Sequence, residues 1–219
     1  MSYFNFTDAF TAHLTSGKKR KAEEAEKIVN DVKARLIKLE ERDYWVAGYG
    51  SILNERSREK TMPNAKDALP AYVKGWERIF NLDCKTQTVL NVQPTKNRGQ
   101  KLPVVAVKVP YGDMFDFILR ERNYDIKEVP LYSETGEVLD EKAIMVVATD
   151  KNQLADWWPN MEYVQANIYG AHELGGDDFV EKYLDTTYFY SDNKLTKTSL
   201  REYISPYAVE HFKEVDSWY

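Results

Sequence analysis

Residues 44–53, Tyr-Trp-Val-Ala-Gly-Tyr-Gly-Ser-Ile-Leu, have the composition of a strand that ends in a loop able to hold an anion. The aromatic and β-branched residues at 44–46 suit a half-buried strand. Gly48 and Gly50 allow positive φ and let the backbone approach a ligand closely. Successive backbone N–H groups in such a turn can point at an anion. The alternative is an ordinary turn at the end of a strand, because short glycine motifs also occur by chance.

Glu121 is the carboxylate whose position best suits chemistry. It lies at the end of a predicted short amphipathic helix over 112–122, just before a predicted strand that begins at Tyr124. From that point its side chain can project into a cavity that the strands enclose. The alternative is that Glu121 pairs on the surface with Arg120, Arg122 or another basic side chain.

Three short motifs follow one another along the chain. They are Tyr-Gly-Ser-Ile-Leu at 49–53, Arg-Glu-Arg-Asn-Tyr at 120–124, and Pro-Asn-Met-Glu-Tyr at 159–163, which continues to Tyr-Gly-Ala at 169–171. Together they resemble the γ-glutamylcyclotransferase-like family, which has a Y-G-S-x-L loop, an essential glutamate followed by a tyrosine, and a P-x-x-x-Y…G-A helix. The second motif looks most like the ChaC branch, where the pattern is close to R-E-K-G-G-Y. The resemblance covers residues 44–187.

The resemblance implies a small mixed α/β barrel with a substrate cavity. It also implies an enzyme that converts γ-glutamyl compounds to 5-oxoproline and releases an amine or amino acid. Glu121 is carried over as the acid/base. The substrate-binding residues carried over are Tyr49, Gly50, Ser51, Ile52, Leu53, Tyr124 and Tyr163. Within that set, the loop backbone is implied to hold the substrate's α-carboxylate, and the tyrosines to line or close the pocket.

Two residues depart from the family's pattern. Ile52 stands where many members have Asn, and the expected Gly-Gly before the tyrosine is reduced to Asn123, which shortens the pocket rim. A different class of function is therefore kept open: a binding module of the same fold that recognises a γ-glutamyl or amino-acid-like group without turning it over. A Glu121 side chain exposed on the outer surface would exclude the enzyme.

The implied reaction gives a glutamate a defined task. In a γ-glutamyl amide the substrate's own α-amine attacks the γ-carbonyl and closes a five-membered ring, a proximity effect that contributes on the order of 7–11 kcal/mol in ideal geometry. An ammonium cannot attack, so a base must take its proton, and the leaving amine must receive one. One carboxylate between the two nitrogens can do both. Burial that raises the carboxylate's pKa favours this role.

Other residue types offer less chemistry. His13, His172 and His211 lie far apart without a metal-ligand spacing, so we expect no metal site, and the implied reaction needs no cofactor. Cys84 is the single cysteine, which fits a core residue and a reducing compartment. The net charge of −5 does not favour nucleic acid or an anionic membrane as partner. With no apolar run near 18 residues, we expect a cytoplasmic protein.

Periodicity predicts the elements that position these motifs. Residues 16–43 form a predicted amphipathic helix with a narrow apolar stripe. This helix either mediates a homodimer or binds another protein, which would make the chain chiefly an interaction protein, or it lies along its own domain. The predicted strands, 44–46, 71–83, 86–93, 102–109, 124–132 and 142–149, cluster with few helices between them. Residues 62–70 are a predicted loop. A helix from 159 is expected to break at 175–176, and the tail from 186 has no clear period.

The fold class expected from this order is α+β, with a closed or strongly curved mixed sheet, flanking helices and an extra N-terminal helix. Three parts are predicted: an N-terminal extension at 1–43, a γ-glutamylcyclotransferase-like domain at 44–190, and a C-terminal tail at 191–219 packed on that domain. The identity of the γ-glutamyl compound lies in the far half of the pocket, for which the sequence offers no motif.

Overall fold

The computed structural model describes residues 22–83, 88–148, 159–191 and 196–215 of the 219-residue chain. Its helical segments are α2 (Ala22–Leu36), η1 (Ser51–Leu53), α3 (Glu55–Glu59), η2 (Tyr111–Asp113), α4 (Met114–Arg120), α5 (Met161–Asp185), α6 (Leu200–Tyr203) and α7 (Pro206–Glu214). Its strands are β1 (Tyr44–Gly48), β2 (Lys66–Lys74), β3 (Trp76–Asp83), β4 (Thr88–Pro94), β5 (Lys101–Val109), β6 (Tyr124–Tyr132), β7 (Val138–Ala148), β8 (Thr187–Ser191) and β9 (Thr196–Ser199). The predictions for His13 and Cys84 lie outside the described residues.

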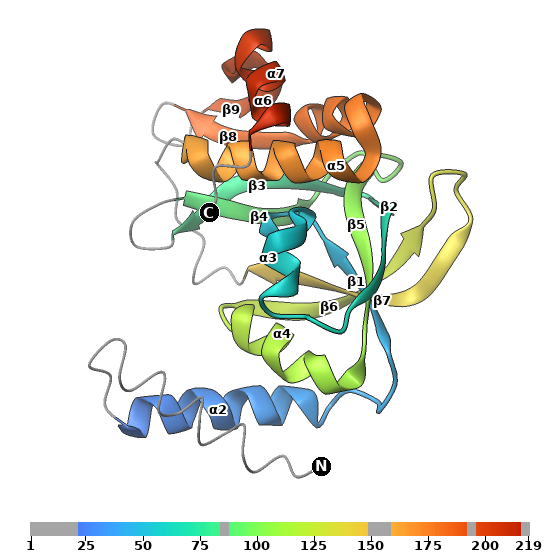
Figure 1. Cartoon of the computed structure of the whole chain (residues 1–219), viewed down its shortest axis with the longest axis vertical. Helices are drawn as coiled ribbons and strands as arrows, with labels where there is room; N and C mark the ends of the chain where they lie inside the picture. Colours follow the sequence, from blue (N-terminus) through green and yellow to red (C-terminus); the bar gives the residue numbers. More distant parts are fainter. Residues whose placement is uncertain (1–21, 84–87, 149–158, 192–195, 216–219) are drawn as a thin grey trace.

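Five strands close a barrel in the order β1-β5-β2-β6-β7 (Figure 1). β7 runs parallel to β1, with Val46 opposite Ile144, and the other neighbours are antiparallel. β5 is buried along most of its length, which explains its nearly continuous apolar run. The expected α+β fold with a closed mixed sheet is confirmed.

A second sheet has the strand order β4-β3-β8-β9, with β8 parallel to β3. It contacts the barrel through β3 on β5 and β4 on β7. The long helix α5 packs on the C-terminal helix α7 (Figure 1) and also on η1. Since β8 and β9 form one hairpin, the second sheet contains residues on both sides of position 190, and the division into 1–43, 44–190 and 191–219 stays a prediction.

The prediction of one strand over 71–83 is wrong. Gly75 has φ 78°, a left-handed conformation that side chains disfavour, and it separates β2 from β3. The chain therefore leaves the barrel at Lys74 and enters the second sheet at Trp76. β2 also begins at Lys66, inside the segment 62–70 that the sequence predicts as a loop.

The C-terminal tail contains regular elements although its sequence shows no clear period. Ser199 caps α6 by accepting a hydrogen bond from the Arg201 N–H, and Ser205 caps α7 by accepting one from the Ala208 N–H. α6 and β9 span four residues each, too short for a periodic pattern to emerge. The break predicted inside the preceding helix is confirmed, because Gly175 and Gly176 have non-helical dihedrals within α5.

The N-terminal helix α2 ends at Leu36, short of the predicted end at residue 43. Its apolar stripe is buried: Ala25, Val29, Val32 and Leu36. The helix packs on α4 (Figure 1), and the Arg35 Nη1 donates to the Tyr124 carbonyl at 2.8 Å. The helix thus lies along its own domain, and a homodimer through it is not shown. Among the described helices, none combines the length and apolarity needed to cross a membrane.

Candidate active site

β1 runs into the turn η1 through two glycines that allow tight packing. A Cβ at Gly48 would lie 2.7 Å from Cγ2 of Ile52, and one at Gly50 would lie 2.8 Å from the Tyr163 hydroxyl oxygen. Neither glycine has positive φ, and Gly50 has φ −119°. The expectation that positive φ explains these glycines is therefore wrong. They are needed because neighbouring side chains come too close to leave room for a Cβ.

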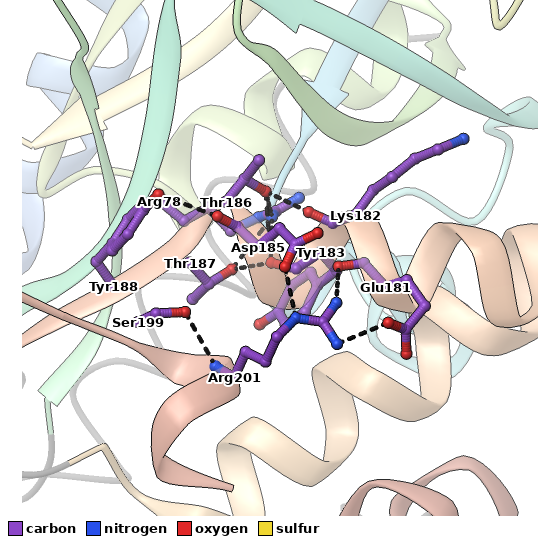
Figure 2. A network of polar contacts seen from close by, with 10 residues as sticks. All are labelled: Arg78, Glu181, Lys182, Tyr183, Asp185, Thr186, Thr187, Tyr188, Ser199 and Arg201. Carbon is purple, nitrogen blue, oxygen red and sulfur yellow. Dashed lines mark hydrogen bonds and ion pairs between the residues drawn. The ribbon is translucent and has the colours of Figure 1, made fainter. Parts of the chain in front are cut away.

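Arg78 holds the start of the turn from inside the protein. It is fully buried, and its Nε donates to the Tyr49 carbonyl at 2.8 Å. Its Nη atoms donate to four further oxygens, those of Pro103 O, Tyr183 O (3.5 Å), Thr186 Oγ1 (3.1 Å) and Thr187 Oγ1 (3.3 Å). Figure 2 shows Arg78 beside Tyr183, Thr186 and Thr187 at the end of α5. Burial lowers the pKa of Arg78 to about 10, so the guanidinium stays charged at neutral pH.

Two further arginines hold the rest of the turn. Arg58 donates through Nη1 to the carbonyls of Ile52 (2.9 Å) and Leu53 (2.6 Å). Arg120 donates through Nη2 to the Ser51 hydroxyl at 2.7 Å. Arg120 also donates to three oxygens next to α3, those of Ser57 O (2.7 Å), Ser57 Oγ (2.8 Å) and Thr61 Oγ1 (2.9 Å). Hydrogen bonds from charged donors contribute about 1.5–3 kcal/mol each, so this turn is held firmly.

Glu121 follows directly after α4, where its backbone N–H donates to the Phe117 carbonyl at 3.0 Å. Its side chain is 12% exposed, and Oε1 lies 3.0 Å from Arg120 Nε. Burial raises the pKa of Glu121, and the positive charges of Arg120 and Arg122 only partly oppose that shift. Glu121 thus forms the ion pair with Arg120 that the alternative predicts, but this ion pair lies inside the protein rather than on the outer surface.

A small cavity of about 40 Å³ joins the motifs. It brings together most of the residues predicted from the sequence: Tyr49, Gly50, Ser51, Ile52, Glu121, Tyr124 and Tyr163. Leu53 is placed apart, because it lines a different cavity and its N–H already donates to the Gly50 carbonyl at 2.8 Å. The Leu53 amide is thus engaged within the turn.

Three tyrosines surround Glu121 in different hydrogen-bonding states. The Tyr49 hydroxyl is buried and has no hydrogen-bond partner among the described residues. Burial, and then the charge of Glu121, raise its pKa well above the ordinary value, so it remains a donor. Burial and the charge of Glu121 likewise raise the pKa of Tyr163 to about 12. The Ser51 backbone N–H, which donates a hydrogen bond to the Tyr163 hydroxyl, partly opposes this rise. The Tyr124 hydroxyl donates to the Leu90 carbonyl at 3.1 Å.

Comparison with known proteins gives likeness in structure only. No family profile and no curated protein matches the chain. A solved structure described as a γ-glutamyl cyclotransferase superposes with a TM-score of 0.58 at 15% identity, covering 79% of this chain and 99% of that one. The chain has the γ-glutamylcyclotransferase fold. An uncharacterised protein from Homo sapiens matches with a TM-score of 0.58 at 17% identity, covering 79% of this chain and 99% of its own. YkqA from Bacillus subtilis matches with a TM-score of 0.55 at 16% identity, covering 69% of this chain and 56% of its own.

A larger cavity of about 260 Å³ lies elsewhere on this γ-glutamylcyclotransferase fold. It is lined by Leu53, Asn54 and parts of α3 and α5, but not by Glu121. Size alone would select it as the active site. The smaller cavity is the candidate active site, because the carboxylate with a raised pKa, Glu121, lines it together with residues 49–52 of the glycine turn (residues 49–53).

Sequence reasoning missed the three arginines that hold the turn. The second motif predicts that Arg120 can pair with Glu121, but the bond of Arg120 to Ser51 joins residues 69 positions apart, which the motif does not predict. Arg58 and Arg78 carry no motif, and only a buried position in the fold reveals them. Among the described residues there is no group of three or more His, Cys, Asp or Glu side chains that could hold a metal ion.

Proposed function

We propose that the chain is a γ-glutamylcyclotransferase-like enzyme that cyclises a γ-glutamyl amide or peptide to 5-oxoproline and releases an amine or amino acid, without a cofactor. The observation that carries the proposal is the position of Glu121. Its carboxylate is 12% exposed, has a raised pKa and lines the same cavity as Gly50 and Ser51. This arrangement supports Glu121 as a base that lies next to a turn able to bind the substrate's α-carboxylate.

Glu121 acts on both nitrogens of the substrate in the proposed mechanism. It takes a proton from the α-ammonium, and the freed amine forms a bond to the γ-carbonyl carbon. It then transfers protons to the leaving nitrogen while the original C–N bond breaks. Of the three ammonium protons, one remains on the ring nitrogen and two end on the released amine as an ammonium. One carboxylate carries these two in turn, so no other base is needed.

The Tyr49 hydroxyl is the donor that we assign to the oxyanion formed at the γ-carbonyl. It is buried, lines the cavity and has no hydrogen-bond partner among the described residues. Its raised pKa keeps it protonated. An unpaired buried donor costs free energy in the free protein, and a developing negative charge supplies the missing acceptor.

Substrate binding requires the cavity to widen. Its volume of about 40 Å³ accommodates little more than a water molecule. The Tyr163 hydroxyl is bonded to the Ser51 backbone N–H, one of the amides assigned to the substrate carboxylate. We therefore expect the carboxylate to replace the Tyr163 hydroxyl at that amide, which moves the ring away from Gly50.

The experiment measures 5-oxoproline release by mass spectrometry. The substrates are glutathione, γ-glutamyl dipeptides and γ-glutamyl amines. Glu121→Gln retains the side-chain shape without a base, and we expect release to fall by at least about 10²–10⁴-fold. Glu128→Gln, at an exposed position of barrel strand β6, is the matched control and should retain native release.

The outcomes separate enzyme from binding module. Release that survives Glu121→Gln shows that another residue is the base. Binding of a γ-glutamyl compound without any release favours a non-catalytic module of the same fold. The ChaC-like form of the second motif and a cytoplasmic location belong to the same proposal, the latter supported by the single cysteine.

A further inference from the structure

The larger cavity begins where the glycine turn ends. Leu53 and Asn54, which close the turn, form part of its wall, and Gly170 of α5 forms another part. A Cβ at Gly170 would lie 2.6 Å from the Asn54 backbone nitrogen, so α5 packs directly against this end of the turn. A ligand in the larger cavity would therefore touch the segment that also shapes the Glu121 cavity.

Charges of both signs line this cavity in equal number. The lining includes two arginines, Arg56 and Arg58, and two glutamates, Glu55 and Glu173. The formal sum of these four charges is zero. A small molecule that carries a separated positive and negative charge matches the lining better.

The cavity wall also contains a buried hydrogen-bond donor that lacks an acceptor. Asn54 is 2% exposed, and its side-chain oxygen accepts from the Ser57 N–H at 3.2 Å, which fixes the orientation of the amide. Its Nδ2 has no hydrogen-bond partner among the described residues. Arg58, 9% exposed, lies on the same wall and adds a positive charge. A carboxylate supplies the acceptor that these groups favour.

We propose that the larger cavity binds a free α-amino acid as a zwitterion, with its carboxylate toward Asn54 and Arg58 and its ammonium toward Glu173. The volume of about 260 Å³ lies just below the range of about 300–1,000 Å³ for drug-sized ligands, which suits a smaller molecule. The binding stands independently of the proposed function. The role of the bound amino acid as a reaction product rests on the proposed function, because cyclisation of a γ-glutamyl amino acid releases an amino acid.

Titration calorimetry on the full chain tests the binding. The probes are L-alanine, L-glutamine and L-methionine, each beside its α-amide, which lacks the carboxylate, and its N-acetyl form, which lacks the ammonium. We expect at least one zwitterion to bind and both of its blocked forms to bind at least tenfold more weakly, equivalent to about 1.4 kcal/mol. Absence of binding by all three amino acids, or equal binding of the blocked forms, overturns the proposal.

A pair of variants locates the site. Ala68 is exposed and lines the cavity without a polar side-chain contact, so Ala68→Phe fills the space and should weaken binding at least tenfold. Leu69, its 42% exposed neighbour, does not line the cavity, and Leu69→Phe should leave the affinity unchanged. Thermal denaturation checks that both variants fold. Unchanged affinity in folded Ala68→Phe places the amino acid elsewhere, for example at Glu121, and overturns the proposal.

Measuring 5-oxoproline release in the same preparation separates the two proposals. Release without amino-acid binding overturns only the second site. If the protein binds an amino acid, Ala68→Phe weakens that binding and no 5-oxoproline is released, the second site is supported. The bound amino acid is then not a product of the proposed reaction.

Discussion

The two ends of the glycine turn use charge in opposite ways. At the Gly50 end, the carboxylate of Glu121 faces a cavity of about 40 Å³, and the nearby arginines do not fully offset its burial. At the Leu53 end, two carboxylates and two guanidinium groups share a cavity of about 260 Å³. A confined, incompletely compensated carboxylate suits proton transfer, whereas balanced charges in a larger space suit the binding of a charged ligand without chemistry.

Apart from Glu121→Gln, Arg120→Met should have the largest effect, because it removes both the ion pair to Glu121 and the bond to Ser51. We expect kcat/KM for 5-oxoproline release to fall about 10²-fold from misplacement of the turn and base. Arg120 lowers the Glu121 pKa, so its loss should also shift the acidic limb of the pH profile to higher pH. Arg122→Met is the control, with a smaller shift in the same direction, since Arg122 is the weaker influence. If Arg120→Met keeps the native kcat/KM and the native pH profile, Arg120 positions neither the turn nor Glu121.

Tyr49→Phe and Tyr183→Phe compare two buried hydroxyls without hydrogen-bond partners among the described residues. Only Tyr49 lines the Glu121 cavity. We expect Tyr49→Phe to lower kcat about 10²-fold, as loss of an oxyanion donor does, and Tyr183→Phe to leave it unchanged. Neither should destabilise the protein by more than about 1 kcal/mol in urea unfolding, because each removes an unsatisfied group. Equal kcat values for the two variants would remove the role of Tyr49.

The free energy of unfolding of Glu121→Gln tests directly whether Arg120 and Arg122 only partly offset the cost of burying the Glu121 charge. The pKa of Glu121 is raised in the folded state, so its contribution to stability is full below the unfolded pKa and is lost as pH rises through the folded pKa. Glutamine stays neutral throughout. We expect equal stability below about pH 4 and a more stable variant near pH 7 in urea unfolding. A variant less stable than the native protein near neutral pH would show that Arg120 compensates the charge fully.

The smallest effect is expected from Arg35→Gln on α2, which removes the bond to the Tyr124 carbonyl beside the cavity. Its cost should be about 1 kcal/mol in the free energy of unfolding, with a several-fold fall in release. Asp31→Asn removes the ion pair of Arg35 with Asp31 (2.9 Å) but keeps the bond to Tyr124, so it should leave release near native. Equal losses of release in both variants would show that the helix, rather than this bond, supports the cavity.

Much of the cavity could be anticipated from local sequence. Residue types indicate the turn at 49–53 and place Glu121 at a helix end, and the family resemblance adds Tyr163 in a later helix. The fold brings Glu121 and Tyr163 to the first four residues of that turn. Strand β6 begins and ends where periodicity predicts. These features are readable because glycine, apolar period and helix ends act over a few neighbouring residues.

The sequence by itself determined the α+β class, the glycine-containing turn at 49–53 and the position of Glu121 at a helix end, since each depends on short-range residue chemistry. Only the tertiary structure brought Glu121 next to that turn. Tertiary structure alone decided how the turn is held. The bond from Arg78 to the Tyr49 carbonyl spans 29 positions, and the bond from Arg120 to Ser51 spans 69. Tertiary structure also decided that Gly75 divides one apolar run between two sheets and that charged side chains from α3 and α5 share one cavity. Such contacts depend on which distant segments become neighbours, and no local pattern of residue types encodes that.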